Sequence, residues 1–89
     1  MYYVYEIINL MGTIEYVGET WIPKSRWCVH KSRGGQFYKR QDVFMNIVAS
    51  FPNKKLSFKY QCDLQTEYGF INDREKLIKN HTNKKPISL

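Results

Sequence analysis

The sequence is poor in cysteine, histidine and proline, and it has no long apolar run. Its two cysteines, Cys28 and Cys62, lack the paired spacing of a zinc site. They are too few for a disulfide framework, and no stretch is typical of a signal peptide, so we expect a reduced, cytoplasmic (intracellular) protein. No apolar stretch approaches the about 18 residues that cross a bilayer, which argues for a soluble chain and against a membrane partner.

Positive charge and aromatic rings are what the chain has in quantity. The chain has fourteen Lys and Arg residues and eight Asp and Glu residues, which gives a net charge of +6. This excess favours a polyanionic or acidic partner, although a basic domain whose charge serves only solubility is the alternative. Seven Tyr, five Phe and two Trp suit a small single domain, because such a chain buries only roughly 60% of its surface and relies on large side chains.

The first twenty residues predict a β-hairpin. Residues 2–8 are β-branched and aromatic, residues 9–12 have turn composition, and residues 13–18 are again strand-forming. A symmetric turn places Tyr5 directly opposite Tyr16, so both phenols would meet on one face of the sheet.

A helix is predicted over residues 23–32, because proline at position 23 suits a first helical turn. Helical spacing places Arg26, His30 and Arg33 on one face of it. A basic and aromatic connection over 36–42 follows, and residues 43–51 are interpreted as a buried strand.

A second long helix is predicted from Asn53, a suitable N-cap, to about Tyr68, with Gly69 as its stop. One face of this helix collects mostly apolar and aromatic side chains, and it turns one amide inward: Ser57, Tyr60, Gln61, Leu64 and Tyr68. Residues 72–81 predict a short further helix before a Lys-rich tail.

The fold class expected from this order, β-β-α-β-α, is α/β (α+β): a small three-stranded, largely antiparallel sheet flanked by helices. We expect the main domain to span residues 1–71. Residues 72–89 would form a C-terminal helical appendage and basic tail.

Four short segments resemble, in order and spacing, the GIY-YIG nuclease superfamily, whose members are small domains that cut DNA with one divalent ion. The segments are Tyr3-Val4-Tyr5 (with Tyr3 in place of the family's glycine), Tyr16-Val17-Gly18, Arg26 with His30, and residues 37–42. The resemblance covers about residues 2–70.

The resemblance implies a role for each matching residue. Tyr5 would act as general base or relay for water, and Tyr16 would orient water or phosphate. Arg26 would neutralise charge on the phosphate, and His30 would shuttle a proton or contact phosphate. One Mg²⁺ (or Mn²⁺) is the implied cofactor. Without the resemblance, the tyrosines would be interpreted as cross-strand packing, and Arg26 with His30 as a solvated helix face.

The chain departs from the family at the metal ligand. The family carries a glutamate seven residues before an aromatic-Gly-aromatic ending, here Tyr68-Gly69-Phe70, and that position is Gln61. A neutral amide should bind Mg²⁺ more weakly than a carboxylate. Three residues remain as alternative ligands if the match is shifted, Glu75 ahead of the others: Asp63, Glu67 and Glu75.

The function expected is a metal-dependent DNA endonuclease that hydrolyses phosphodiester bonds, inactive or weakened in this form by the amide at position 61. The main alternative is a non-catalytic nucleic-acid-binding module of the same fold, and a protein-interaction domain is favoured less. DNA would bind a basic surface formed by Arg26, Lys31, Arg33, Lys39 and Arg40. The sequence leaves a dimer open as an oligomeric state.

Overall fold

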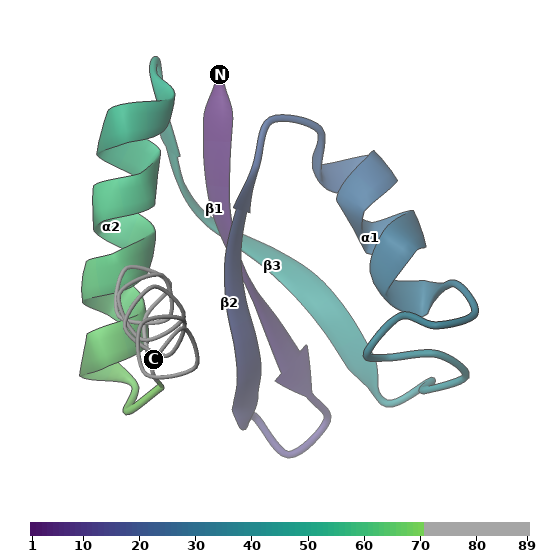
Figure 1. Cartoon of the computed structure of the whole chain (residues 1–89). Helices are drawn as coiled ribbons and strands as arrows, with labels where there is room; N and C mark the ends of the chain where they lie inside the picture. Colours follow the sequence, from purple (N-terminus) through teal and green to yellow (C-terminus); the bar gives the residue numbers. More distant parts are fainter. Residues whose placement is uncertain (71–89) are drawn as a thin grey trace, which may run out of the picture.

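The fold is a three-stranded antiparallel sheet with a helix on each face. The computed structural model describes residues 1–70. Its elements are β1 (Tyr2–Asn9), β2 (Ile14–Thr20), α1 (Pro23–Lys31), β3 (Val43–Phe51) and α2 (Lys54–Glu67). The strand order is β2-β1-β3, and Figure 1 shows α1 and α2 on opposite sides of the sheet. The predicted fold class and element order are confirmed.

The predicted division of the chain near residue 71 remains a prediction. The expected helix over 72–81, the basic tail and Glu75 all lie outside the described residues. Within residues 1–70, no helix has both the length and the apolar character needed to cross a membrane.

The hairpin forms as predicted, but its register does not. Tyr5 pairs with Gly18 rather than with Tyr16. The turn is not symmetric, because the Asn9 amide donates to the Thr13 carbonyl at 3.0 Å and the pairing shifts next to this turn. The shift amounts to two residues, so each side chain keeps its face of the sheet. The rings of Tyr5 and Tyr16 therefore remain neighbours, with centroids 6.0 Å apart.

Helix α1 is one residue shorter than predicted, and Arg33 does not belong to it. The helix ends at Lys31, and Ser32 leaves it with an extended backbone while its hydroxyl donates to the Val29 carbonyl at 2.7 Å. Placing Arg33 on one helical face with Arg26 and His30 was therefore wrong.

Helix α2 begins and ends as its caps predict. The Asn53 side chain accepts a hydrogen bond from the Leu56 amide at 2.9 Å, and Gly69 follows the helix with a φ of +84°. Its buried residues are Ser57, Gln61, Cys62, Leu64 and Gln65. The inward position of Gln61 is confirmed.

Tyr60 and Tyr68, which were predicted on the same face of the helix as Gln61, lie at the border of the buried stripe rather than within it. They are 36% and 38% exposed. The Tyr68 hydroxyl donates to the carboxylate of the buried residue Glu6 at 3.2 Å, so the partly exposed phenol has a hydrogen-bond partner in the protein.

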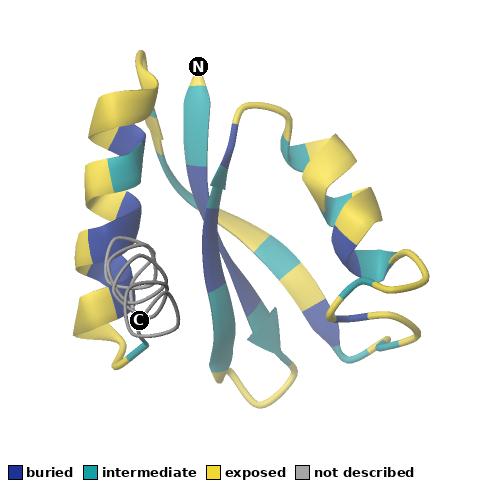
Figure 2. Cartoon of the chain, viewed as in Figure 1, coloured by how far each residue is buried: buried dark blue, intermediate teal, exposed yellow. Residues whose placement is uncertain are grey.

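Strand β3 has the predicted bounds but is not a buried strand. It lies at an edge of the sheet, and only Val43 among its residues is buried. In Figure 2 the middle of β1, the central strand, is dark blue, whereas β3 is largely yellow and teal. An apolar run over 43–51 is compatible with either environment, and the partner strands decide which one forms.

Within residues 1–70 the core consists of two clusters, one under each helix. On the α1 side, buried side chains pack with partly buried neighbours: Tyr5, Ile7, Phe37 and Val43 with Tyr16, Trp27 and Met45. On the α2 side the corresponding set is Val4, Val17 and Leu64 with Ile14, Val48, Phe51 and Phe70. Alternate residues of β1 supply both clusters, as expected for a strand covered on both faces.

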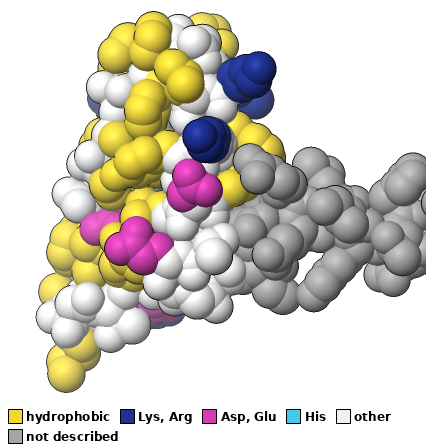
Figure 3. Space-filling view, turned by 90° about the vertical axis from the view of Figure 1, so that its left-hand side faces the viewer, with side chains coloured by type: hydrophobic (Ala, Val, Ile, Leu, Met, Phe, Trp, Pro, Cys, Tyr) yellow, Lys and Arg dark blue, Asp and Glu magenta, His cyan; other side chains and the backbone are white. Residues whose placement is uncertain are grey.

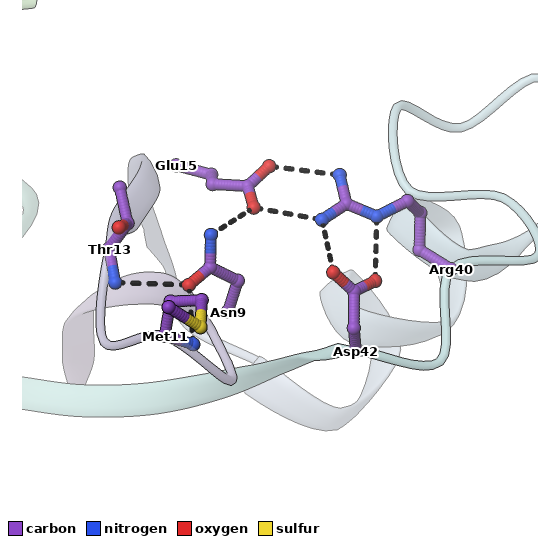
Figure 4. A network of polar contacts seen from close by, with 6 residues as sticks. All are labelled: Asn9, Met11, Thr13, Glu15, Arg40 and Asp42. Carbon is purple, nitrogen blue, oxygen red and sulfur yellow. Dashed lines mark hydrogen bonds and ion pairs between the residues drawn. The ribbon is translucent and has the colours of Figure 1, made fainter.

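A polar network fixes the connection between α1 and β3 to the hairpin (Figure 4). The Arg40 guanidinium donates two hydrogen bonds to Glu15 and two to Asp42, at 2.7 to 2.9 Å. This guanidinium lowers the pKa of Asp42 to about 2 and also lowers the pKa of Glu15. Both carboxylates therefore stay ionised, and the bidentate geometry gives the connection a defined position.

Candidate active site

One pocket of about 270 Å³ collects residues from both strands of the hairpin and from both helices. It is lined by Tyr5, Tyr16, Gly18, Glu19, Arg26, Lys54, Phe58 and Gln61. The structure thus brings together four of the residues that the sequence analysis selected as candidates: Tyr5, Tyr16, Arg26 and Gln61.

Three lining residues were not selected by sequence reasoning: Glu19, Lys54 and Phe58. Glu19 directly follows the Tyr16-Val17-Gly18 segment, but strand alternation assigns it to the other face of the sheet from Tyr16. Lys54 is the first residue of α2. The predicted N-cap could have signalled its position, but not its distance from β2.

The pocket draws on both faces of the sheet because β2 is an edge strand. Tyr5 and Tyr16 pack on the α1 side, whereas Gln61 belongs to α2 on the other side (Figure 1). The strand between them has Gly18 at this point, so no side chain separates the two groups.

Gly18 is required by the positions of the two rings. A Cβ atom at this residue would lie 2.5 Å from the Tyr5 hydroxyl oxygen and 2.8 Å from Cε2 of Tyr16. Both distances are far below van der Waals contact. The glycine therefore lets Tyr5 lie across β2 with its hydroxyl in the pocket.

We expect Gly18→Ala to destabilise the fold and to displace the tyrosine hydroxyls. The added methyl group must push aside a buried ring, and overpacking of this kind costs about 1–3 kcal/mol. Urea unfolding at equilibrium measures the loss. Ser50→Thr, which adds a methyl group at an exposed position of β3, is the matched control. Equal stability of the two variants would contradict the tight packing described for Gly18.

His30 lies behind Tyr5 and is held by a hydrogen bond. The Tyr5 hydroxyl and His30 Nε2 are 2.8 Å apart, and both side chains are buried. The imidazole is surrounded by rings, with centroids 4.8 Å from Tyr16 and 5.7 Å from Phe37. Burial lowers the pKa of His30, and the nearby charge of Arg26 lowers it further. The imidazole is therefore neutral near neutral pH and can exchange a proton with the phenol.

Two cations border the pocket, one from each helix. Arg26 is exposed on α1. The Lys54 side chain on α2 is 71% exposed, with Nζ 3.9 Å from Glu19 Oε1. Figure 3, which views the molecule from the α2 side, shows lysine and arginine side chains in its upper part and carboxylates below them. The exposed lysines of α2 are Lys54, Lys55 and Lys59.

The other predicted DNA contacts do not line this pocket. Lys31 and Lys39 lie over the rings of Trp27 and Tyr38, 5.6 and 5.4 Å from the centroids. Arg33 is exposed in the turn after α1. Arg40 is held between two carboxylates, as described above. Their contact with DNA stays a prediction.

Two of the three alternative acidic ligands lie on α2, and the third lies beyond residue 70. Asp63 and Glu67 are exposed on α2, away from the buried stripe that contains Gln61. Glu75 lies outside the described residues.

The donor atoms of the pocket fit a hard divalent cation. Among the residues that line it, Glu19 carries a carboxylate, Gln61 an amide oxygen, and Tyr5 and Tyr16 each a hydroxyl, all oxygen ligands. No group of three His, Cys, Asp or Glu residues that could hold a metal occurs within residues 1–70. Mg²⁺ does not need such a cage, because it keeps several waters and binds one or two carboxylates together with substrate phosphate.

Comparison with known proteins places the chain in a family. Residues 1–88 match the GIY-YIG catalytic domain, whereas no curated protein and no solved structure matches significantly. A GIY-YIG domain implies a nuclease-type function, which suggests DNA as the substrate. Nucleases of this family generally use a divalent metal ion. With the domain match covering nearly the whole chain, the protein belongs to the GIY-YIG family.

Proposed function

We propose that this protein is a metal-dependent DNA endonuclease whose cleavage is weakened by the neutral amide of Gln61. The observation that carries the proposal is the hydrogen-bonded pair of Tyr5 and His30 in contact with a pocket that also holds Arg26. A proton acceptor, a proton reservoir and a cation are what hydrolysis of a phosphodiester requires from side chains.

The Tyr5 hydroxyl is the group that meets the attacking water. Through its hydrogen bond to His30, Tyr5 can pass its hydroxyl proton to the neutral imidazole as it accepts a proton from the water. Tyr16, whose ring is 6.0 Å from that of Tyr5, lines the same pocket and orients the water or a phosphate oxygen. His30 does not line the pocket and reaches it only through its hydrogen bond to Tyr5, so it is a proton shuttle rather than a phosphate contact.

Arg26 stabilises the negative charge that grows on the phosphate oxygens. It is exposed at the pocket and forms no ion pair with a carboxylate of residues 1–70, so its guanidinium is available to a phosphate. A bound divalent ion would supply further stabilisation of this charge, with oxygen ligands from the same pocket.

DNA would lie across the pocket and contact basic residues on both sides of it. The α1 side offers Arg26 and the predicted contacts Lys31, Arg33 and Lys39. The α2 side offers Lys54, Lys55 and Lys59, which the sequence analysis did not include. Arg40 is the least available of the predicted contacts because four of its hydrogen bonds go to carboxylates.

The test combines binding and cleavage of duplex DNA. We expect binding without metal to weaken with salt, with a slope of log K against log salt of roughly −3 to −5, as a handful of phosphate contacts gives. With Mg²⁺ the chain should nick supercoiled plasmid slowly. Salt-dependent binding with no nicking at any Mg²⁺ concentration would favour the non-catalytic binding module. Affinity that does not change with salt would contradict both the endonuclease and the non-catalytic nucleic-acid-binding module.

A further inference from the structure

Glu19 is a carboxylate in the pocket that the proposed reaction has not used. It lies near the end of β2, and its side chain is only 10% exposed. It lines the same pocket as Gln61, Tyr5 and Arg26. A carboxylate this well buried is costly unless it is paired or binds a cation.

Glu19 has one neutral hydrogen-bond partner and one distant cationic partner. Ser57, which donates its hydroxyl to Glu19 Oε2 at 2.7 Å, is neutral. Lys54 Nζ is 3.9 Å from Oε1, which is beyond hydrogen-bond length, and its side chain is mostly in solvent. Because the Lys54 side chain is largely in solvent and its ammonium is not hydrogen-bonded to Glu19, Lys54 can move away at small cost.

The position of Glu19 relative to Gln61 follows from the helix. Ser57 and Gln61 are four residues apart on α2 and therefore lie on the same face, one above the other. Because Ser57 is bonded to Glu19, the carboxylate of β2 faces the stripe of α2 that carries the Gln61 amide. The negative charge missing at position 61 is thus present on the opposite wall of the same pocket.

We propose that Glu19 is the anionic ligand of the divalent cation in this chain, and that Gln61 adds only its neutral amide oxygen. The carboxylate is supplied by strand β2 instead of helix α2. When the cation binds, it takes the place of the Lys54 ammonium beside Glu19. The inference rests on the proposed function for the presence of a cation, but it concerns the residue that holds it.

The test measures cation binding without DNA. Mn²⁺ is titrated into the full chain near neutral pH, and the loss of the free-ion signal in electron paramagnetic resonance reports binding. We expect Glu19→Gln to weaken Mn²⁺ binding by about tenfold or more, since losing a carboxylate ligand should cost at least as much as losing an outer-shell partner. Glu67→Gln removes the same charge from an exposed position of α2 and should leave the dissociation constant unchanged.

Two further variants keep the result interpretable. Lys54→Met should tighten Mn²⁺ binding, because it removes the competing ammonium. The double variant Glu19→Gln with Gln61→Glu should regain binding, because it returns the carboxylate to α2. Circular dichroism of each variant checks that the fold is intact, and the double variant shows that a loss in Glu19→Gln is not general unfolding.

The outcomes are distinct. Equal Mn²⁺ binding by Glu19→Gln and the unmodified chain, or a loss with Glu67→Gln instead, would overturn the assignment of Glu19, as would no Mn²⁺ binding by the unmodified chain. Failure to nick DNA, with Mn²⁺ binding that depends on Glu19, would instead contradict the proposed function and leave the ligand assignment standing.

Discussion

Gln61→Glu should raise Mg²⁺-dependent nicking of plasmid DNA by about a thousandfold, equivalent to about 4 kcal/mol of transition-state stabilisation. The change is nearly isosteric and adds a carboxylate to the pocket that already contains Glu19 and Arg26. Two carboxylates on opposite walls hold a divalent ion more firmly than a carboxylate and an amide. Single-turnover nicking with and without Mg²⁺ measures the gain.

The same variant has a second signature in its stability. Residue 61 is only 3% exposed, so an added carboxylate without a cation is buried at a cost, and the melting temperature should fall. Mg²⁺ should restore it by binding to the folded state alone. Gln61→Met, which fills the site without charge, is the control and should gain neither nicking nor a response to Mg²⁺. A Gln61→Glu variant that nicks no faster than the unmodified chain would refute the placement of the metal beside position 61.

The elements of this fold could be predicted because their signals are local. The Asn53 cap, the Gly69 stop and Pro23 each act within one turn of the chain, and the structure places α2 and the start of α1 where these residues indicate. The bounds of β3 likewise follow from a mostly apolar run. Such signals define where an element lies, but not what covers it.

The errors in the burial of β3 and in the role of Arg40 concern contacts between distant parts of the chain, whereas the errors in the hairpin register and at the end of α1 are local. The burial of β3 depends on strand order, which no local pattern encodes. The hairpin register depends on the hydrogen bonds of its turn. Because the predicted register was wrong by two residues, each side chain was still assigned to the correct face of the sheet, and the predicted proximity of Tyr5 and Tyr16 holds. Arg40 was assigned to DNA from charge alone, and its partner Glu15 lies 25 positions earlier in the sequence.

Glu19 shows in the same way that local patterns do not predict contacts between distant elements at the candidate site. Alternation along β2 separates it from Tyr16, and this is correct for the faces of the sheet. The pocket nevertheless includes both residues, because β2 is an edge strand and Gly18 leaves its edge open. Only the packing of α2 against β2, seen in the Ser57 contact, brings the carboxylate to the site.

Arg26→Ala should abolish the nicking gained by Gln61→Glu, with a loss of about a hundredfold to a thousandfold, as for removal of one donor to a developing oxyanion. Within residues 1–70 no carboxylate pairs with Arg26, so the variant leaves no buried charge behind and the fold should be unaffected. Lys24→Ala, which removes an exposed cation from the same helix but not from this pocket, is the matched control and should reduce DNA affinity without a comparable loss of rate.

A second measurement separates the role of Arg26 from general damage to the site. Its charge contributes to the lowered pKa of His30, after burial, so its removal should raise that pKa toward the ordinary value. Nuclear magnetic resonance of the His30 ring protons against pH reports this change even in an inactive variant. A rate loss in Arg26→Ala no larger than in Lys24→Ala would mean that the arginine serves DNA binding alone. A raised pKa of His30 together with the large rate loss is what we expect, because one guanidinium acts on both the phosphate charge and the imidazole behind Tyr5.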